Sequence, residues 1–302
     1  MKKVVIAIDS FKGCLSSAEA GKAAAKGIRS VFPECEIRSL PIADGGEGML
    51  DVLIAATNGR EVQISAHNPL MEWHDTYYGI SEDEKTAFIE MASISGLPLV
   101  PPEKRNPMQT TSYGTGELIR DALERGCRNF IIGIGGSATN DAGLGMLQAL
   151  GFRFLNKEGK ILETGNGKIL MEVVSIDTSF VHPDLRTSHF TVACDVQNPF
   201  CGPEGAAYIF APQKGADRKM VEALDAGMKN FAEVIFHKTG KDISNHPGAG
   251  AAGGMGGSLL AFLNAKLKPG IQLMLETLDF SNKIKGADLI ITGEGKADKQ
   301  TL

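Results

Sequence analysis

Hydrophobic and polar positions change their period within the first forty residues of the chain. Residues 2–8 are continuously apolar after two lysines, which is typical of a parallel strand buried on both faces. Ser16 and Glu19 then have the spacing of a capping box, in which each side chain satisfies an amide at a helix start. An alanine-rich helix is expected from there to about Phe32, because Pro33 cannot continue it. The chain therefore begins with a strand followed by a helix.

A second strand and helix follow, and then the pattern changes. Residues 36–40 predict a strand, and a helix is expected up to Thr57. This order is the start of a doubly wound parallel sheet of the flavodoxin or Rossmann type. From about Glu61 the apolar runs come close together, at residues 62–66, 75–80 and 86–91. Such spacing favours antiparallel pairing over crossover connections.

The rest of the chain returns to alternating helices and strands. The same reasoning predicts helices over residues 116–125 and 218–237, and strands from Phe130, over 189–194 and over 287–292. The sequence thus indicates an α/β protein. Its ligand-like loops leave the carboxyl ends of strands, where open α/β sheets bind ligands.

Composition and charge exclude several classes of protein. The chain has 302 residues, enough for two domains, with a net charge of −5 and a pI of about 5.7. It carries no basic stripe, so a nucleic-acid partner is not expected. No apolar run reaches membrane-spanning length, and five scattered cysteines form no zinc motif. We expect a cytoplasmic protein that binds small molecules and no membrane; a homodimer is left open.

The segment 130–143 carries the strongest chemical signal. An apolar run ends in glycines, small hydroxyl residues and a carboxylate. Glycine lets backbone amides approach an anion closely, and a helix N-terminus adds positive charge. Phosphate is therefore expected at Gly133, Gly135, Gly136, Ser137 and Thr139. Asp141 would repel it unless a divalent cation lies between them, which makes Asp141 a candidate metal ligand in a kinase-like site.

Two other interpretations of this segment stay open. Gly133, Gly135 and Ala138 match a dinucleotide fingerprint, with Glu158 in the place of the ribose-binding carboxylate. That would make the protein a nicotinamide-dependent oxidoreductase. The segment could also be a glycine-rich turn that only lets a strand and a helix pack.

Further candidates lie in other loops at predicted strand ends. Lys12, with Ser10 beside it, could neutralise a phosphate or a substrate carboxylate. Asp44 and Asp195 are both candidates for the general base, and each has a structural alternative, as a helix N-cap or an Asx turn. Arg105 could anchor a carboxylate through its two parallel donors.

The last predicted strand leads into a second acidic glycine turn. Glu294 lies between two glycines and is a candidate metal ligand, and Lys296 is a candidate phosphate ligand. A strand that ends in such a turn normally continues into a helix. The first sheet also has only one returning strand. We therefore expect the C-terminal part of this domain to be missing, with one edge of the sheet exposed.

Seven of these segments occur in the same order in bacterial type I glycerate kinases, which the whole chain resembles. They are residues 9–16, 43–48, 114–117, 133–143, 194–199, 210–215 and 292–296. The resemblance implies phosphorylation of D-glycerate by ATP and Mg²⁺, at the 2-hydroxyl, giving 2-phosphoglycerate. It also implies a discontinuous Rossmann-like domain, residues 1–66 and 285–302, around an inserted α/β domain, residues 67–284. A truncated or non-catalytic remnant that binds glycerate or nucleotide is the alternative.

Overall fold

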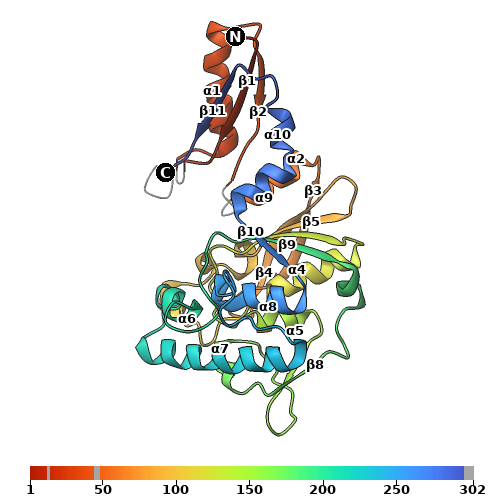
Figure 1. Cartoon of the computed structure of the whole chain (residues 1–302), viewed down its shortest axis with the longest axis vertical. Coiled ribbons are helices and arrows are strands. Elements are labelled where there is room, and N and C mark those ends of the chain that lie inside the picture. The colour runs from red at the N-terminus through yellow and green to blue at the C-terminus, as the bar shows by residue number, and fades with distance from the viewer. Residues whose placement is uncertain (12–13, 44–47, 296–302) are drawn as a thin grey trace.

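Two sheets, one smaller and one larger, organise the computed structural model, which describes residues 1–11, 14–43 and 48–295. The smaller sheet has three parallel strands in the order β11-β1-β2, namely β11 (Leu289–Gly293), β1 (Lys3–Ile8) and β2 (Glu36–Ser39). Figure 1 shows it at one end of an elongated molecule, with the N-terminus beside it.

The larger sheet has six strands in the order β10-β9-β6-β5-β4-β3. Their bounds are β3 (Arg60–His67), β4 (Trp73–Ile80), β5 (Thr86–Glu90), β6 (Asn129–Gly133), β9 (His189–Ala193) and β10 (Lys266–Lys268). The first three pair antiparallel, and β5, β6, β9 and β10 pair parallel. Glu90, Gly133 and Ala193 are register partners, so three neighbouring strands end at one edge. A separate two-stranded ribbon joins β7 (Arg153–Leu155) to β8 (Ser175–Asp177).

The capping box predicted for the first helix is present in α1 (Ser17–Val31). Ser16 Oγ accepts the Glu19 N–H at 3.2 Å, and Glu19 accepts the Ser16 N–H at 2.9 Å. The helix packs on β1, where Val4, Ile6 and Ala20 belong to one small buried cluster. The strand β11, which pairs with β1, is an edge strand in the described part of the chain. Its residues Leu289 and Ile290 are each 43% exposed.

Helices cover the larger sheet on both sides and surround its core (Figure 1). Two of them, α2 and α9, share a cluster with Phe88 and Ala193 and lie on the side toward the smaller sheet. The α-helices are α2 (Met49–Ala56), α3 (Ala92–Ser95), α4 (Tyr113–Glu124), α5 (Leu144–Ala149), α6 (Ala206–Phe210), α7 (Arg218–Thr239), α8 (Met255–Phe262), α9 (Gly270–Thr277) and α10 (Phe280–Lys283). Short 3₁₀ turns lie at η1 (Leu97–Leu99), η2 (Pro102–Lys104), η3 (Gly167–Met171), η4 (Pro183–Thr187), η5 (Pro212–Lys214) and η6 (Ala251–Gly254).

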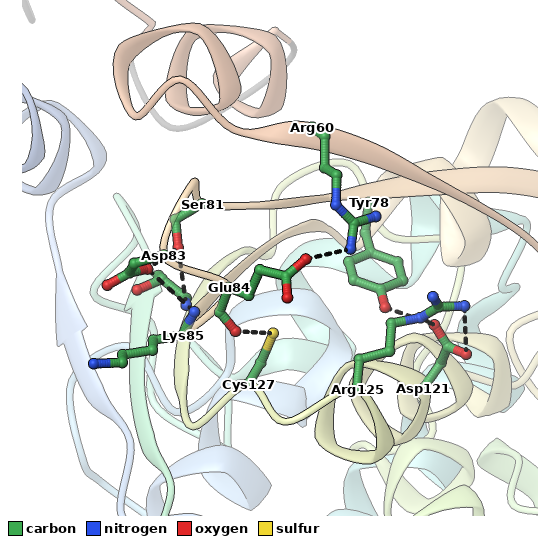
Figure 2. Close-up of polar contacts among 10 residues, drawn as sticks. Arg60, Tyr78, Ser81, Asp83, Glu84, Lys85, Asp121, Arg125 and Cys127 are labelled. Carbon is green, nitrogen blue, oxygen red and sulfur yellow. Dashed lines mark hydrogen bonds and ion pairs between the residues drawn. The ribbon is translucent and has the colours of Figure 1, made fainter.

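A buried tyrosine ties α4 to the larger sheet (Figure 2). Tyr78 on β4 is fully buried and donates its hydroxyl to Asp121 Oδ2 at 2.6 Å. Asp121 is in turn paired with Arg125 one helical turn later, also at 2.6 Å. Burial, followed by the contact with Asp121, raises the pKa of the Tyr78 hydroxyl, so the phenol stays a proton donor. This contact fixes α4, which packs against α5.

The predicted α/β class is confirmed, as are the main helices and strands to within a few residues. The strands β7, β8 and β10 and the short helices α3, α6, α9 and α10 were not predicted. The division into residues 1–66 with 285–302 and residues 67–284 stays a prediction; hydrogen bonding puts β3 in the larger sheet and β11 in the smaller one. No helix in the described ranges is long and apolar enough to cross a membrane.

Candidate functional site

Two pockets open at the carboxyl ends of strands, where the sequence predicted ligand-binding loops. The larger has a volume of about 800 Å³ and lies between the smaller sheet and α2 on the larger one. It is lined by Asp9 and Ser10 after β1, by the start of α1, by Ala43, and by Tyr77 and Glu90 of the larger sheet. Since residues of both sheets line it, a ligand here would contact both halves of the molecule.

The smaller pocket, of about 310 Å³, lies at the ends of β6 and β9. The predicted phosphate loop forms one wall, with Gly135, Gly136 and Ser137. Asp195 and Lys214 line it as well. Gly135 and Gly136 are exposed, and Gly136 has a φ of +73°, a conformation that favours glycine. The structure therefore presents the predicted glycine turn to an open cavity.

Beyond Ser137 the loop turns into the core and does not expose a helix N-terminus. The next helix, α5, begins only at Leu144, and Asp141 lies at its start. Asp141 is fully buried and accepts four hydrogen bonds: from Ser112 N (2.8 Å), Ser112 Oγ (2.7 Å), Gly143 N (3.1 Å) and Gly145 N (3.2 Å). Its carboxylate thus occupies the place where an anion on α5 would bind. The dinucleotide interpretation fails for this reason, and Glu158 is exposed in a turn after β7.

Asp141 is placed to hold the loop together. Burial raises the pKa of this carboxyl, and its four hydrogen bonds lower it and so offset part of that effect. Glu294, the other predicted metal ligand, follows β11 in the smaller sheet and is exposed, so the described geometry does not join the two in one site. The described residues contain no cluster of three or more His, Cys, Asp or Glu side chains that could hold a metal ion.

Lys214 is a site residue that the sequence did not single out. It ends the 3₁₀ turn η5 and is 2% exposed. Its ammonium donates to Ser137 Oγ at 2.8 Å and to the Thr139 carbonyl at 2.5 Å, across 77 and 75 residues of sequence. Burial lowers the pKa of Lys214 to about 7, although the nearby Asp141 charge raises it. The lysine therefore fixes the far side of the glycine loop.

Asp195 lies where the sequence placed it, directly after β9 and in the smaller pocket. Its Oδ1 accepts the N–H of Gly270, the first residue of α9, at 2.9 Å. The carboxylate thus contacts the start of α9 and also lines the pocket. The predicted roles, a general base or an Asx turn, stay predictions.

The structure does not bring the described substrate anchors, Ser10 and Arg105, together in one pocket. Ser10 lines the larger one, and its N–H donates to Asp9 Oδ1 at 2.6 Å. Arg105 lies by the turn that carries Lys214: a Cβ at Gly215 would come within 2.3 Å of its carbonyl oxygen. Lys12, Asp44 and Lys296 lie outside the described residues; the N-cap of α2 is Gly48.

An α/β fold with a glycine turn, a buried ammonium and a carboxylate around one pocket is the arrangement of a phosphotransferase acting on small molecules. The chain matches the model of the glycerate kinase family over residues 4–302. It is 51% identical to a glycerate kinase of Haemophilus influenzae, covering 99% of this chain and 79% of that protein. A glycerate 2-kinase of Escherichia coli strain K12 is 50% identical, with 99% and 78% covered.

A solved structure agrees with these relatives. A candidate glycerate kinase 2 from Salmonella typhimurium LT2 matches with a TM-score of 0.95 at 46% identity, over 100% of this chain and 80% of that one. The chain belongs to the glycerate kinase family, as its motifs predicted.

Proposed function

We propose that this protein transfers the γ-phosphoryl group of ATP to the 2-hydroxyl of D-glycerate, giving 2-phosphoglycerate and ADP. The observation that carries the proposal is the smaller pocket, in which an open glycine turn and a buried lysine face a carboxylate at the end of the neighbouring strand. Half of the aligned positions are identical to relatives named glycerate kinase or glycerate 2-kinase, which supports the choice of substrate and of acceptor atom.

The phosphates of ATP are placed at the glycine turn. Gly135, Gly136 and Ser137 line the pocket and offer backbone amides and a hydroxyl. Gly133 and Thr139 are buried members of the same loop and are proposed to support its conformation. Lys296 is proposed as a further phosphate ligand. Mg²⁺ is proposed to enter on the phosphates of ATP. The described residues contain no group of three or more His, Cys, Asp or Glu side chains that could hold the ion, so we derive no step through it.

The acceptor hydroxyl needs a base and glycerate needs an anchor. The hydroxyl oxygen attacks the γ-phosphorus, the bond to the β–γ bridging oxygen breaks, and the hydroxyl proton passes to an aspartate. Asp195 is the described candidate for this base, and Asp44 is the other. The carboxylate of glycerate is proposed to be bound by Ser10, Lys12 or Arg105. Ser10 lines the larger pocket and Arg105 lies against Gly215, so the two are not assigned to one contact.

The remaining proposals concern partners and place. Glycerate and ATP are the expected ligands, in the cytoplasm. A homodimer remains an open proposal.

Turnover of D-glycerate by the full chain tests the function. With ATP and Mg²⁺ we expect ADP release coupled to phosphoglycerate, and ³¹P NMR should identify the 2-isomer. L-glycerate and a reaction without Mg²⁺ serve as controls. Binding of glycerate or ATP without turnover would favour the non-catalytic alternative. The 3-isomer as the sole product would overturn the choice of hydroxyl.

A further inference from the structure

Lys214 is held in an unusual position for a charged side chain. It is 2% exposed and closes the turn η5, in which Gly215 follows with a φ of +96°. A Cβ at Gly215 would collide with the carbonyl of Arg105, so this turn is fixed against the neighbouring loop. The backbone therefore directs the lysine toward the glycine loop and leaves it little freedom to reach solvent.

The hydrogen bonds of Lys214 do not use all of its donors. An ammonium group has three N–H donors. The described contacts of Lys214 are the Ser137 hydroxyl and the Thr139 carbonyl, both neutral acceptors. The carboxylates nearby are Asp141, which accepts four other donors, and Asp195, which accepts the Gly270 amide. The Lys214 side chain also lines the pocket beside Gly135 and Gly136.

Lys241, which is partly buried, is a lysine with a purely structural role and can be compared with Lys214. Lys241 donates to three acceptors, the carbonyls of Leu260 and Ala261 and the side chain of Asn264, and so closes the end of α8. Lys241 lines neither the larger nor the smaller pocket. Lys214 has one donor fewer in use and adjoins a cavity, which indicates a missing acceptor on the cavity side.

We propose that Lys214 binds an anionic oxygen of the phosphoryl group that is transferred, and that Ser137 and Thr139 hold its ammonium in position for this contact. The inference rests on the proposed phosphotransfer and adds the group that neutralises the phosphate. A phosphate oxygen would supply the third acceptor and the opposite charge. The low pKa of Lys214 agrees with this, because burial destabilises an ammonium that has no anionic partner.

Chemical rescue distinguishes a charge contact from a packing contact. Lys214→Ala should lower kcat by about 10²–10³-fold, the usual cost of removing one donor to a developing charge. Its KM for glycerate should stay nearly unchanged. Added propylammonium should raise the kcat of Lys214→Ala at least about tenfold, because its ammonium replaces the lost donor. Added 1-propanol, which has a similar size but no charge, should not. Lys241→Ala, the matched control, should keep normal kcat and show no rescue.

Either of two results would overturn the inference: a near-normal kcat in Lys214→Ala, or equal rescue of that variant by propylammonium and 1-propanol. If Lys214→Ala does not fold, Lys214→Met keeps the volume and is tested in its place. Binding of inorganic tripolyphosphate, measured by calorimetry, should be lost in Lys214→Met and kept in Lys241→Ala. This readout is independent of glycerate: absent turnover by the wild-type chain would overturn the proposed function, and tripolyphosphate binding would still decide the role of Lys214.

Discussion

A carboxylate next to a phosphate-binding loop can act in two ways, and Asp141 shows how burial separates them. The sequence favoured a metal ligand, because an unpaired carboxylate would repel phosphate. In the structure the carboxylate accepts four donors from Ser112, Gly143 and Gly145 and has no exposed surface. Three of those donors contact Oδ2 and one contacts Oδ1. A metal ion on Oδ2 would have to displace at least one of them.

Asp141→Asn should therefore affect stability more than metal use. The amide keeps the shape but turns one acceptor into a donor that faces other N–H groups. We expect a loss of about 2–4 kcal/mol in the free energy of unfolding, the range for an unmatched buried polar group. Urea denaturation measures it. Where the variant remains folded, the Mg²⁺ concentration for half-maximal activity should match the wild type; a large increase would instead support metal binding by Asp141.

The residues of the glycine turn were predictable and Lys214 was not, for a physical reason. Exposure of Gly135 and Gly136 follows from local chemistry, since glycines after a buried strand allow an open turn. Lys214 donates to Ser137, which lies 77 residues earlier in the sequence, so local sequence does not reveal the contact. The segment around Lys214 indicates only a proline–glycine turn. A lysine in a short turn is normally solvated. The signal that could have found it is the apolar setting of that lysine, between Phe210 and Gly215.

Among the elements, α9 shows how a site residue can also support the fold. This helix was not predicted, because its eight residues follow a three-residue strand that gives almost no periodic signal. Asp195 caps it at Gly270 while facing the smaller pocket. The long strands of the larger sheet were predictable from continuous apolar runs. The short strands and helices depend on tertiary contacts.

The two roles of Asp195 can be separated with a pair of substitutions. Asp195→Asn keeps an oxygen for the Gly270 amide but removes the base, so kcat should fall about 10²–10⁴-fold with little change in stability. Asp195→Ala removes both and should also cost about 1 kcal/mol of stability. Asp217→Asn is the matched control, because Asp217 also accepts an amide at a helix start, that of Met220 in α7, and lines neither functional pocket. Equal kcat in Asp195→Asn and wild type would leave Asp195 a cap only and favour Asp44 as base.

On the scale of the whole molecule, the two sheets have cores of very different extent. The main cluster of the larger sheet contains buried side chains from β3, β4, β5, β6 and β9 and from helices on one of its faces. The smaller sheet relies on a short cluster that includes Val4, Ile6 and Ala20. Its edge strand β11 leaves Leu289 and Ile290 partly exposed. Since the larger pocket lies between the two, binding there depends on the less buried half.

Hydrogen exchange should reveal this difference in local stability. Amide protection follows the free energy of local opening, which falls where few apolar groups are buried. Peptides covering β1, β2 and β11 should therefore exchange well before those covering β5, β6 and β9, measured by mass spectrometry at neutral pH. ATP and D-glycerate together should slow exchange in both β1 and the glycine turn, because the residues directly after β1 line the larger pocket and the glycine turn lines the smaller one. ADP alone should protect only the glycine turn. Uniform exchange across both sheets, or protection by ligands confined to one half, would contradict this account of how the two halves share the site.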